Sequence, residues 1–115
     1  MRTISLALAA GLLSLAAIAA PLTGARADDP ALTIELKDHK FQPANPTIPA
    51  NTKVKLTVKN LDATPAEFES GDFDVEKVIP GNSEITVNIG PLEAGTYEFY
   101  DEYHEDESTT NLVVQ

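Results

Sequence analysis

Alternating apolar and polar residues predict several strands along this chain. The clearest alternation covers 53–59, where Val54, Leu56 and Val58 are separated by lysine and threonine. A period of two residues predicts a strand with one buried face. Similar patterns predict strands at 32–37, 46–50, 67–70, 74–79, 84–89, 96–100 and 111–115. After residue 27, no window supports a helix of useful length, so the prediction is an all-β fold.

Turn signals between these strands indicate how they connect. Loops are expected at 38–43 and 60–66, and Pro, Gly or Asn residues end most of the other segments. Residues 92–97 have the Leu-x-x-Gly-x-Tyr pattern of a tyrosine corner, in which the phenol bonds back to the backbone at a Greek-key crossing. Tyr97 is therefore expected to be structural. Short, regularly spaced strands predict a Greek-key antiparallel β-sandwich of about seven to eight strands.

The first 27 residues have the pattern of a secretory signal peptide. Arg2 precedes an apolar run over 4–20, and an Ala-x-Ala sequence at 25–27 provides a cleavage site. The run is shorter than the roughly 20 residues that span a bilayer, so a membrane anchor is disfavoured. We expect a mature single domain over 28–115 that is exported to the periplasm and is not inserted in the membrane.

The charge of the predicted domain limits its partners. The leader contains both arginines and no acidic residue, which leaves six lysines against 18 acids, a net charge of −12. Few cationic side chains are available to neutralise phosphates, so nucleic acid and anionic membranes are excluded as expected partners. Cations, or a basic face of another protein, are the natural alternatives.

Five carboxylates surround a single histidine in the segment 101–107. Crowding of like charge costs free energy unless a partner neutralises it, so this segment is typical of a loop that holds a cation. The alternative is an acidic loop that only keeps a secreted protein soluble. The carboxylates are Asp101, Glu102, Glu105, Asp106 and Glu107, and the histidine is His104.

Strand direction predicts that the only two histidines converge. Successive strands of an antiparallel sandwich reverse direction, so alternate connections fall at the same end. His39, the loop leading into Glu67, the turn at Pro80 and the segment with His104 then share one end. These residues also have an ordinary structural interpretation. His39 can be a surface loop residue, and Glu67 and Glu69 can belong to the solvated face of a strand.

Ligands at that end would be nitrogen and oxygen atoms. The chain has no cysteine, and its one methionine, Met1, belongs to the predicted leader. Imidazole and carboxylate suit Fe(II), Fe(III), Cu(II), Mn(II) or Zn(II), whereas Cu(I) prefers sulfur. His39 and His104 with one glutamate would make a face of two histidines and one carboxylate.

The predicted domain resembles the cupredoxin family, and within it the small periplasmic cupredoxin-like proteins associated with bacterial ferrous-iron permeases. The resemblance covers nearly all of 28–115 and is most specific at 37–43, 60–70, 76–81, 89–92 and 102–106. It implies a cupredoxin-like sandwich and a role in iron uptake.

The resemblance also implies that a blue-copper site is absent. Blue-copper cupredoxins use two histidines, a cysteine and usually a methionine as copper ligands. In this chain the position of the first histidine is occupied by Ala66 or Glu67, and that of the cysteine by Asp101. The position of the second histidine is occupied by His104, and that of the methionine by about Thr109. One of the four is retained, so a copper thiolate and its electron transfer are not expected. The resemblance implies instead a site with oxygen ligands around Glu67, Glu102 and His104, with second choices at His39, Glu69, Asp101 and Asp106.

Two functional hypotheses follow. The first is a periplasmic protein that binds an iron or copper ion, Cu(II) in the latter case, and passes it to a membrane permease or another transport component, with assistance to Fe(II) oxidation as a family-level implication. No electron-accepting centre is evident, which counts against autonomous catalysis. The second is a metal-free acidic module that docks a basic partner. A hydrolase is disfavoured because no convincing pair of nucleophile and base is present.

Overall fold

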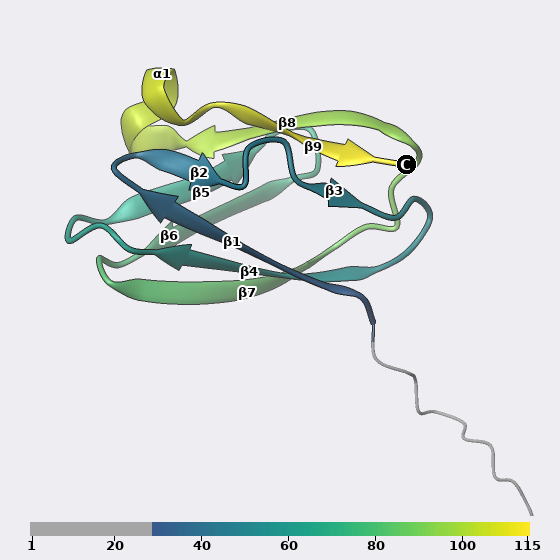
Figure 1. The fold of residues 1–115 in the computed structure, drawn as a ribbon, viewed down its shortest axis with the longest axis horizontal. Helices are drawn as coiled ribbons and strands as arrows, with labels where there is room; N and C mark the ends of the chain where they lie inside the picture. The colour runs from purple at the N-terminus through teal and green to yellow at the C-terminus, as the bar shows by residue number, and fades with distance from the viewer. Residues whose placement is uncertain (1–28) are drawn as a thin grey trace, which may run out of the picture.

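Nine strands make up two packed sheets in residues 29–115, which are the residues that the computed structural model describes (Figure 1). The strands are β1 (Ala31–Lys37), β2 (Lys40–Gln42), β3 (Thr47–Ile48), β4 (Val54–Asn60), β5 (Ala66–Ser70), β6 (Val75–Ile79), β7 (Ser83–Ile89), β8 (Gly95–Asp101) and β9 (Thr110–Val114). A 3-10 turn, η1 (Glu102–His104), and one helical turn, α1 (Glu105–Ser108), join β8 to β9. The predicted signal peptide lies outside the described residues.

The β-sandwich prediction is confirmed, but its sheets are mixed rather than purely antiparallel. One sheet has the order β2-β1-β4-β7 and the other β3-β9-β8-β5-β6. β1 pairs in parallel with β4, and β3 pairs in parallel with β9. The reason is that the chain crosses to the second sheet as β3 and then returns as β4, which re-enters beside β1 in the same direction.

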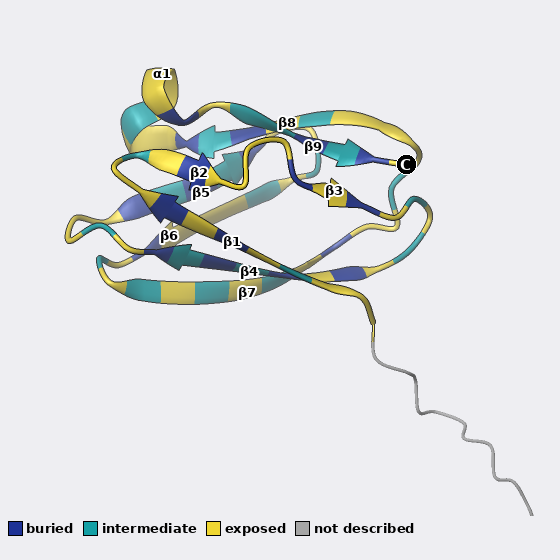
Figure 2. Cartoon of the chain, viewed as in Figure 1, coloured by how far each residue is buried: buried dark blue, intermediate teal, exposed yellow. Residues whose placement is uncertain are grey.

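The core lies between the two sheets and is formed by the alternating apolar residues of each strand (Figure 2). Phe41, Phe68 and Phe99 form an aromatic cluster, with ring centroids 5.0 Å apart for Phe41 and Phe99 and 5.4 Å apart for Phe68 and Phe99. Full burial of a phenylalanine side chain stabilises a fold by about 1.5–3 kcal/mol. This cluster therefore fixes β2, β5 and β8 relative to one another.

The tyrosine-corner prediction is confirmed, because the Tyr97 hydroxyl donates a hydrogen bond to the Glu93 carbonyl at 2.8 Å. The prediction of a simple loop over 38–43 is wrong. Those residues contain β2 and a two-residue turn in which Asp38 and His39 have φ of 53° and 63°. Such a hairpin turn normally has Asn-Gly or Asp-Gly, and here His39 stands in place of the glycine, so the sequence signal is weak.

The lysines and the carboxylates are unevenly placed. Five of the six lysines lie in β1, β2 and β4 or directly before β4. The second sheet, its β5–β6 turn and the η1–α1 segment together carry 11 of the 18 acidic residues of the chain. Among residues 29–115, none of the helical turns is long and apolar enough to cross a bilayer.

Candidate metal centre

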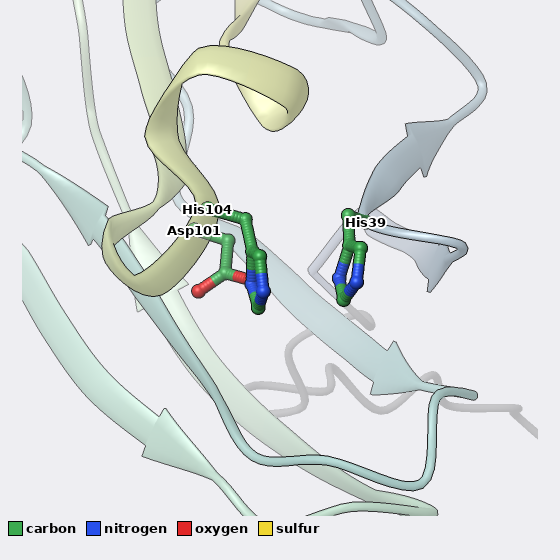
Figure 3. Close-up of side chains that lie close together, drawn as sticks. All are labelled: His39, Asp101 and His104. Atoms are coloured by element: carbon green, nitrogen blue, oxygen red, sulfur yellow. The ribbon is translucent and has the colours of Figure 1, made fainter.

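His39, Asp101 and His104 lie together at one end of the sandwich (Figure 3). One possible ligand atom from each lies within 4.8 Å of the others. The two imidazole rings are stacked, with centroids 3.6 Å apart and planes inclined by 17°. The predicted convergence of the two histidines is therefore observed.

The β1–β2 hairpin turn places His39. Both residues of the turn adopt a left-handed backbone conformation, which costs of order 1–3 kcal/mol for a residue other than glycine. The Asp62 carboxylate offsets this cost by accepting hydrogen bonds from the N–H groups of Asp38 and His39, at 2.7 and 3.0 Å. Asp62 comes from the β4–β5 connection, 23 residues away from His39 in the sequence.

Asp101 is the last residue of β8 and is only 1% exposed. Its Oδ1 accepts hydrogen bonds from the N–H groups of Glu67, at 2.9 Å, and Tyr103, at 3.0 Å. Its Oδ2 lies 3.2 Å from His104 Nδ1. The Asp101 N–H donates to Ser108 Oγ at 2.7 Å, which ties the start of the segment to the end of α1. This carboxylate is thus held rigidly beside the imidazole.

The donor atoms decide which metal ions the centre suits. Two imidazoles and one carboxylate suit borderline or moderately hard ions such as Cu(II), Fe(II) and Zn(II). A type 1 copper site does not fit, because the described residues contain no sulfur atom and a carboxylate lies where a thiolate would be needed. The carboxylate that lies with the histidines is Asp101, which the sequence analysis gave as a second choice, whereas the first-choice Glu67 lies in a separate group.

A second acidic group lies on the outer face of the second sheet, and consists of Glu67, Glu69 and Glu76. Glu69 and Glu76 are directly opposite one another on β5 and β6. Partial burial raises the pKa of Glu67, and a hydrogen bond with Glu76 and its negative charge raise it further. Partial burial raises the pKa of Glu69 as well, followed by repulsion from Glu102 and Glu76. We call these three residues the outer carboxylate group.

The other two predicted site residues lie apart from the histidines. Glu102 begins η1, and its charge acts on Glu67 and Glu69, so it belongs electrostatically with the outer carboxylate group. Asp106 is exposed on α1 and lines an open surface hollow formed by residues 103–107. Within residues 29–115, Asp106 joins neither group of potential ligands.

Sequence reasoning missed Asp62. Partial burial raises the pKa of Asp62, but hydrogen bonds from the His39 and Asp38 N–H groups lower it more, so the pKa lies below its ordinary value. The carboxylate therefore stays charged beside the His39 ring. The available sequence signal was an Asn-x-Asp pattern at 60–62, since Asn and Asp side chains commonly bond to nearby backbone in turns.

The comparisons with known proteins agree with this fold. The model of the family described as "Cupredoxin-like domain" matches residues 4–114. An uncharacterized protein of Rickettsia prowazekii (strain Madrid E) is 37% identical over 81 residues. That match covers 70% of this chain and 65% of the Rickettsia protein, so this chain spans slightly less than two thirds of its relative.

Solved structures share the fold at low identity. The metal-binding domain of the Cu(I)-exporting P-type ATPase CopA of Streptococcus pneumoniae has a TM-score of 0.64 and 15% identity, over 74% of this chain and 84% of that one. A Cu(I) form of an amicyanin variant has a TM-score of 0.61 and 18% identity, over 79% and 88%. A purple cupredoxin from Nitrosopumilus maritimus has a TM-score of 0.57 and 20% identity, over 76% and 100%.

These structural similarities establish the fold, and the family match covers almost the whole chain. Together with the two-sheet architecture, the tyrosine corner and the histidine of the β8–β9 connection, they identify the family. The chain belongs to the cupredoxin-like domain family.

Proposed function

We propose that this protein binds an iron or copper ion, Cu(II) in the latter case, through His39, Asp101 and His104, and that it is not a blue-copper electron carrier. The observation that carries this proposal is the pair of stacked imidazoles beside a buried carboxylate that backbone N–H groups hold in place through one of its oxygens. Two neutral imidazoles and one carboxylate leave a bound divalent ion with one net positive charge. The surrounding acidic residues favour such a charge.

The cellular role in this proposal is export to the periplasm and delivery of the ion to a membrane permease or another transport component. Support comes from the signal-peptide pattern of residues 1–27, the acidic charge of the domain and its resemblance to iron-permease-associated cupredoxins. The proposed role is binding and transfer of the ion. Oxidation of Fe(II) would need an electron acceptor, and residues 29–115 provide no evident centre of that kind.

The outer carboxylate group favours a second candidate function, a metal-free surface that docks a basic partner protein. Its three glutamates repel one another, and a cationic partner would relieve that repulsion. Such docking would weaken strongly as salt is added and would respond to charge reversal along the whole acidic face.

Metal titration of the purified protein tests the proposed function. Under anaerobic conditions, Cu(II), Fe(II), Zn(II) and Mn(II) are titrated into wild type, His39→Ala, His104→Ala and Glu67→Ala, with Glu84→Gln as the control. Glu84 is an exposed β7 residue opposite Lys59 and belongs to neither group of potential ligands, so its substitution removes one negative charge and no candidate ligand. We expect saturable one-to-one binding of at least one ion, weakened at least about 10-fold by each histidine variant.

The variants separate the two functions. If Glu67→Ala weakens metal binding and the histidine variants leave it unchanged, the ion binds at the outer carboxylate group. If no ion binds more strongly than to any acidic protein, the metal hypothesis fails, and salt-dependent binding to basic partners becomes the function to pursue.

A further inference from the structure

Asp62 is placed to control the orientation of the His39 ring. Its Oδ1 accepts the Asp38 N–H at 2.7 Å, and its Oδ2 accepts the His39 N–H at 3.0 Å. The same Oδ2 lies 3.5 Å from His39 Nδ1. One carboxylate therefore touches both the backbone that positions this histidine and one of its ring nitrogens.

Asp62 is itself held in place through both its backbone N–H and its backbone carbonyl. Its N–H donates to Asn60 Oδ1 at 3.0 Å, and its carbonyl accepts the Asn82 N–H at 2.9 Å. The Asn60 amide donates in turn to the Thr64 and Ile79 carbonyls, at 2.8 and 3.1 Å. Asn60 is completely buried, so its position is fixed by the core. A rigid chain of contacts thus runs from the core through Asp62 to His39.

A carboxylate oxygen lies beside one ring nitrogen of His39. The Oδ2 atom of Asp62 is 3.5 Å from Nδ1, which is a charge contact at the outer limit of hydrogen-bond distance. A carboxylate next to Nδ1 favours the tautomer with the proton on Nδ1, which leaves the Nε2 lone pair free. Histidines that bind metals generally donate their other ring N–H to a carboxylate or carbonyl in this way, because it fixes the ring and raises its basicity.

We propose that Asp62 is a positioning residue of the metal centre, which fixes the His39 ring so that Nε2 is its metal-binding atom. The inference rests on the proposed function, and it adds a residue that does not itself touch the ion. Asp62 lies in a connection that contributes no candidate ligand, so it would not be found by a search for ligands.

The test compares Asp62→Asn with Asp72→Asn in the full protein. Asp72 is an exposed residue whose carboxylate accepts a hydrogen bond from the Glu98 N–H at 2.8 Å. It lies just after the C-terminal end of β5, whereas Glu67 lies near the N-terminal end of that strand. Both substitutions therefore remove one charge from a carboxylate that bonds to backbone. The readouts are the protonated ring nitrogen of His39, measured by ¹⁵N NMR on the metal-free protein, and the affinity for Cu(II).

When the His39 imidazole holds a single proton, we expect that proton on Nδ1 in wild type and in Asp72→Asn. For Asp62→Asn, we expect a shift of that proton toward Nε2 and a Cu(II) affinity about 10- to 100-fold lower. In a His39→Ala background, the Asp62→Asn substitution should have little further effect on the affinity, because its action passes through His39. If Asp62→Asn does not fold, Asp62→Ser, whose hydroxyl can still accept a turn N–H, takes its place.

Unchanged tautomer and affinity in the folded Asp62 variant would overturn the positioning role, and the proposed function would stand. An equal loss of affinity with and without His39 would also overturn it, since Asp62 would then act on the fold as a whole. If wild type binds no Cu(II) or other ion, the proposed function fails. The NMR measurement then still decides whether Asp62 sets the ring of His39.

Discussion

Asn60 is completely buried, and its side chain joins the connections at the histidine end of the sandwich. Its Nδ2 donates to the carbonyls of Thr64, Ile79 and Pro80, while its Oδ1 accepts the Asp62 N–H. A buried carbonyl or N–H that loses its partner carries a desolvation cost of about 1–3 kcal/mol. This one side chain therefore stabilises the β4–β5 and β6–β7 connections together.

We predict that Asn60→Ala lowers the free energy of unfolding by about 2–3 kcal/mol, because it leaves several buried polar groups without a partner. Chemical denaturation of the metal-free protein measures the change. Asn88→Ala, at an exposed position of β7, is the control and should change stability by no more than about 0.5 kcal/mol. Equal effects of the two substitutions would contradict the role assigned to Asn60.

At the scale of the strands, the sequence predicts most of the long elements and misses the shortest ones. Strands such as β4 and β7 alternate over seven residues, which is a strong signal. β2 has three residues, and its turn has no glycine, because Asp62 stabilises the left-handed backbone from a distant part of the chain. A contact of that kind cannot be read from local sequence.

The predicted convergence of the two histidines is observed, and the carboxylate that lies with them is Asp101, a second choice in the sequence analysis. Alternating strand direction brings His39 and His104 together, as expected. Period two, however, directs Glu67 to the face opposite Phe68, whereas the register pairs Asp101 with Phe68 and directs it inward. Asp101 therefore joins the histidines, and Glu67 contributes only its backbone N–H to that carboxylate. The register of β5 and β8, which the sequence does not reveal, decides this difference.

The turn between β6 and β7 packs closely on the β4–β5 connection. A Cβ added to Gly81 would lie 2.0 Å from the Ala63 carbonyl oxygen, so one of the two connections would have to move. We predict that Gly81→Ala destabilises the protein by about 1–3 kcal/mol. Thermal unfolding beside Gly71→Ala, where a Cβ meets nothing within 4 Å, provides the comparison. The control should stay within about 0.5 kcal/mol of wild type, and an equally small effect at Gly81 would show that the contact is not tight.

At the scale of the whole molecule, the outer carboxylate group makes stability depend on pH. The pKa of Glu69 is raised in the folded protein by partial burial and by repulsion from Glu102 and Glu76. Between the pKa of the unfolded chain, about 4.3, and the raised folded pKa, the folded state binds more protons than the unfolded state. The stability that protonation of Glu69 contributes is therefore fully present below the unfolded pKa, and it is lost as the pH rises through the folded pKa.

We predict that Glu69→Gln raises the melting temperature of the metal-free protein at pH 7, because it removes the negative charge that Glu102 and Glu76 repel in the folded state. The gain should shrink as the pH is lowered toward 4, where the wild-type glutamate is already becoming protonated. Thermal unfolding across this range measures the difference, and Glu84→Gln on the other sheet is the matched control. A gain that is the same at pH 4 and pH 7 would rule out repulsion among the carboxylates as its cause.

Five of the six lysines lie in or directly before β1, β2 and β4, and most carboxylates lie in the second sheet, its β5–β6 turn and η1–α1. This uneven placement gives the molecule an electric dipole. A dipole rotates in the field of a charged partner before contact is made. Cationic targets should therefore meet the acidic side first, and more of their encounters should be correctly oriented. The charge separation would act mainly on association rates, which should rise as ionic strength falls, while the lifetime of the final complex changes much less.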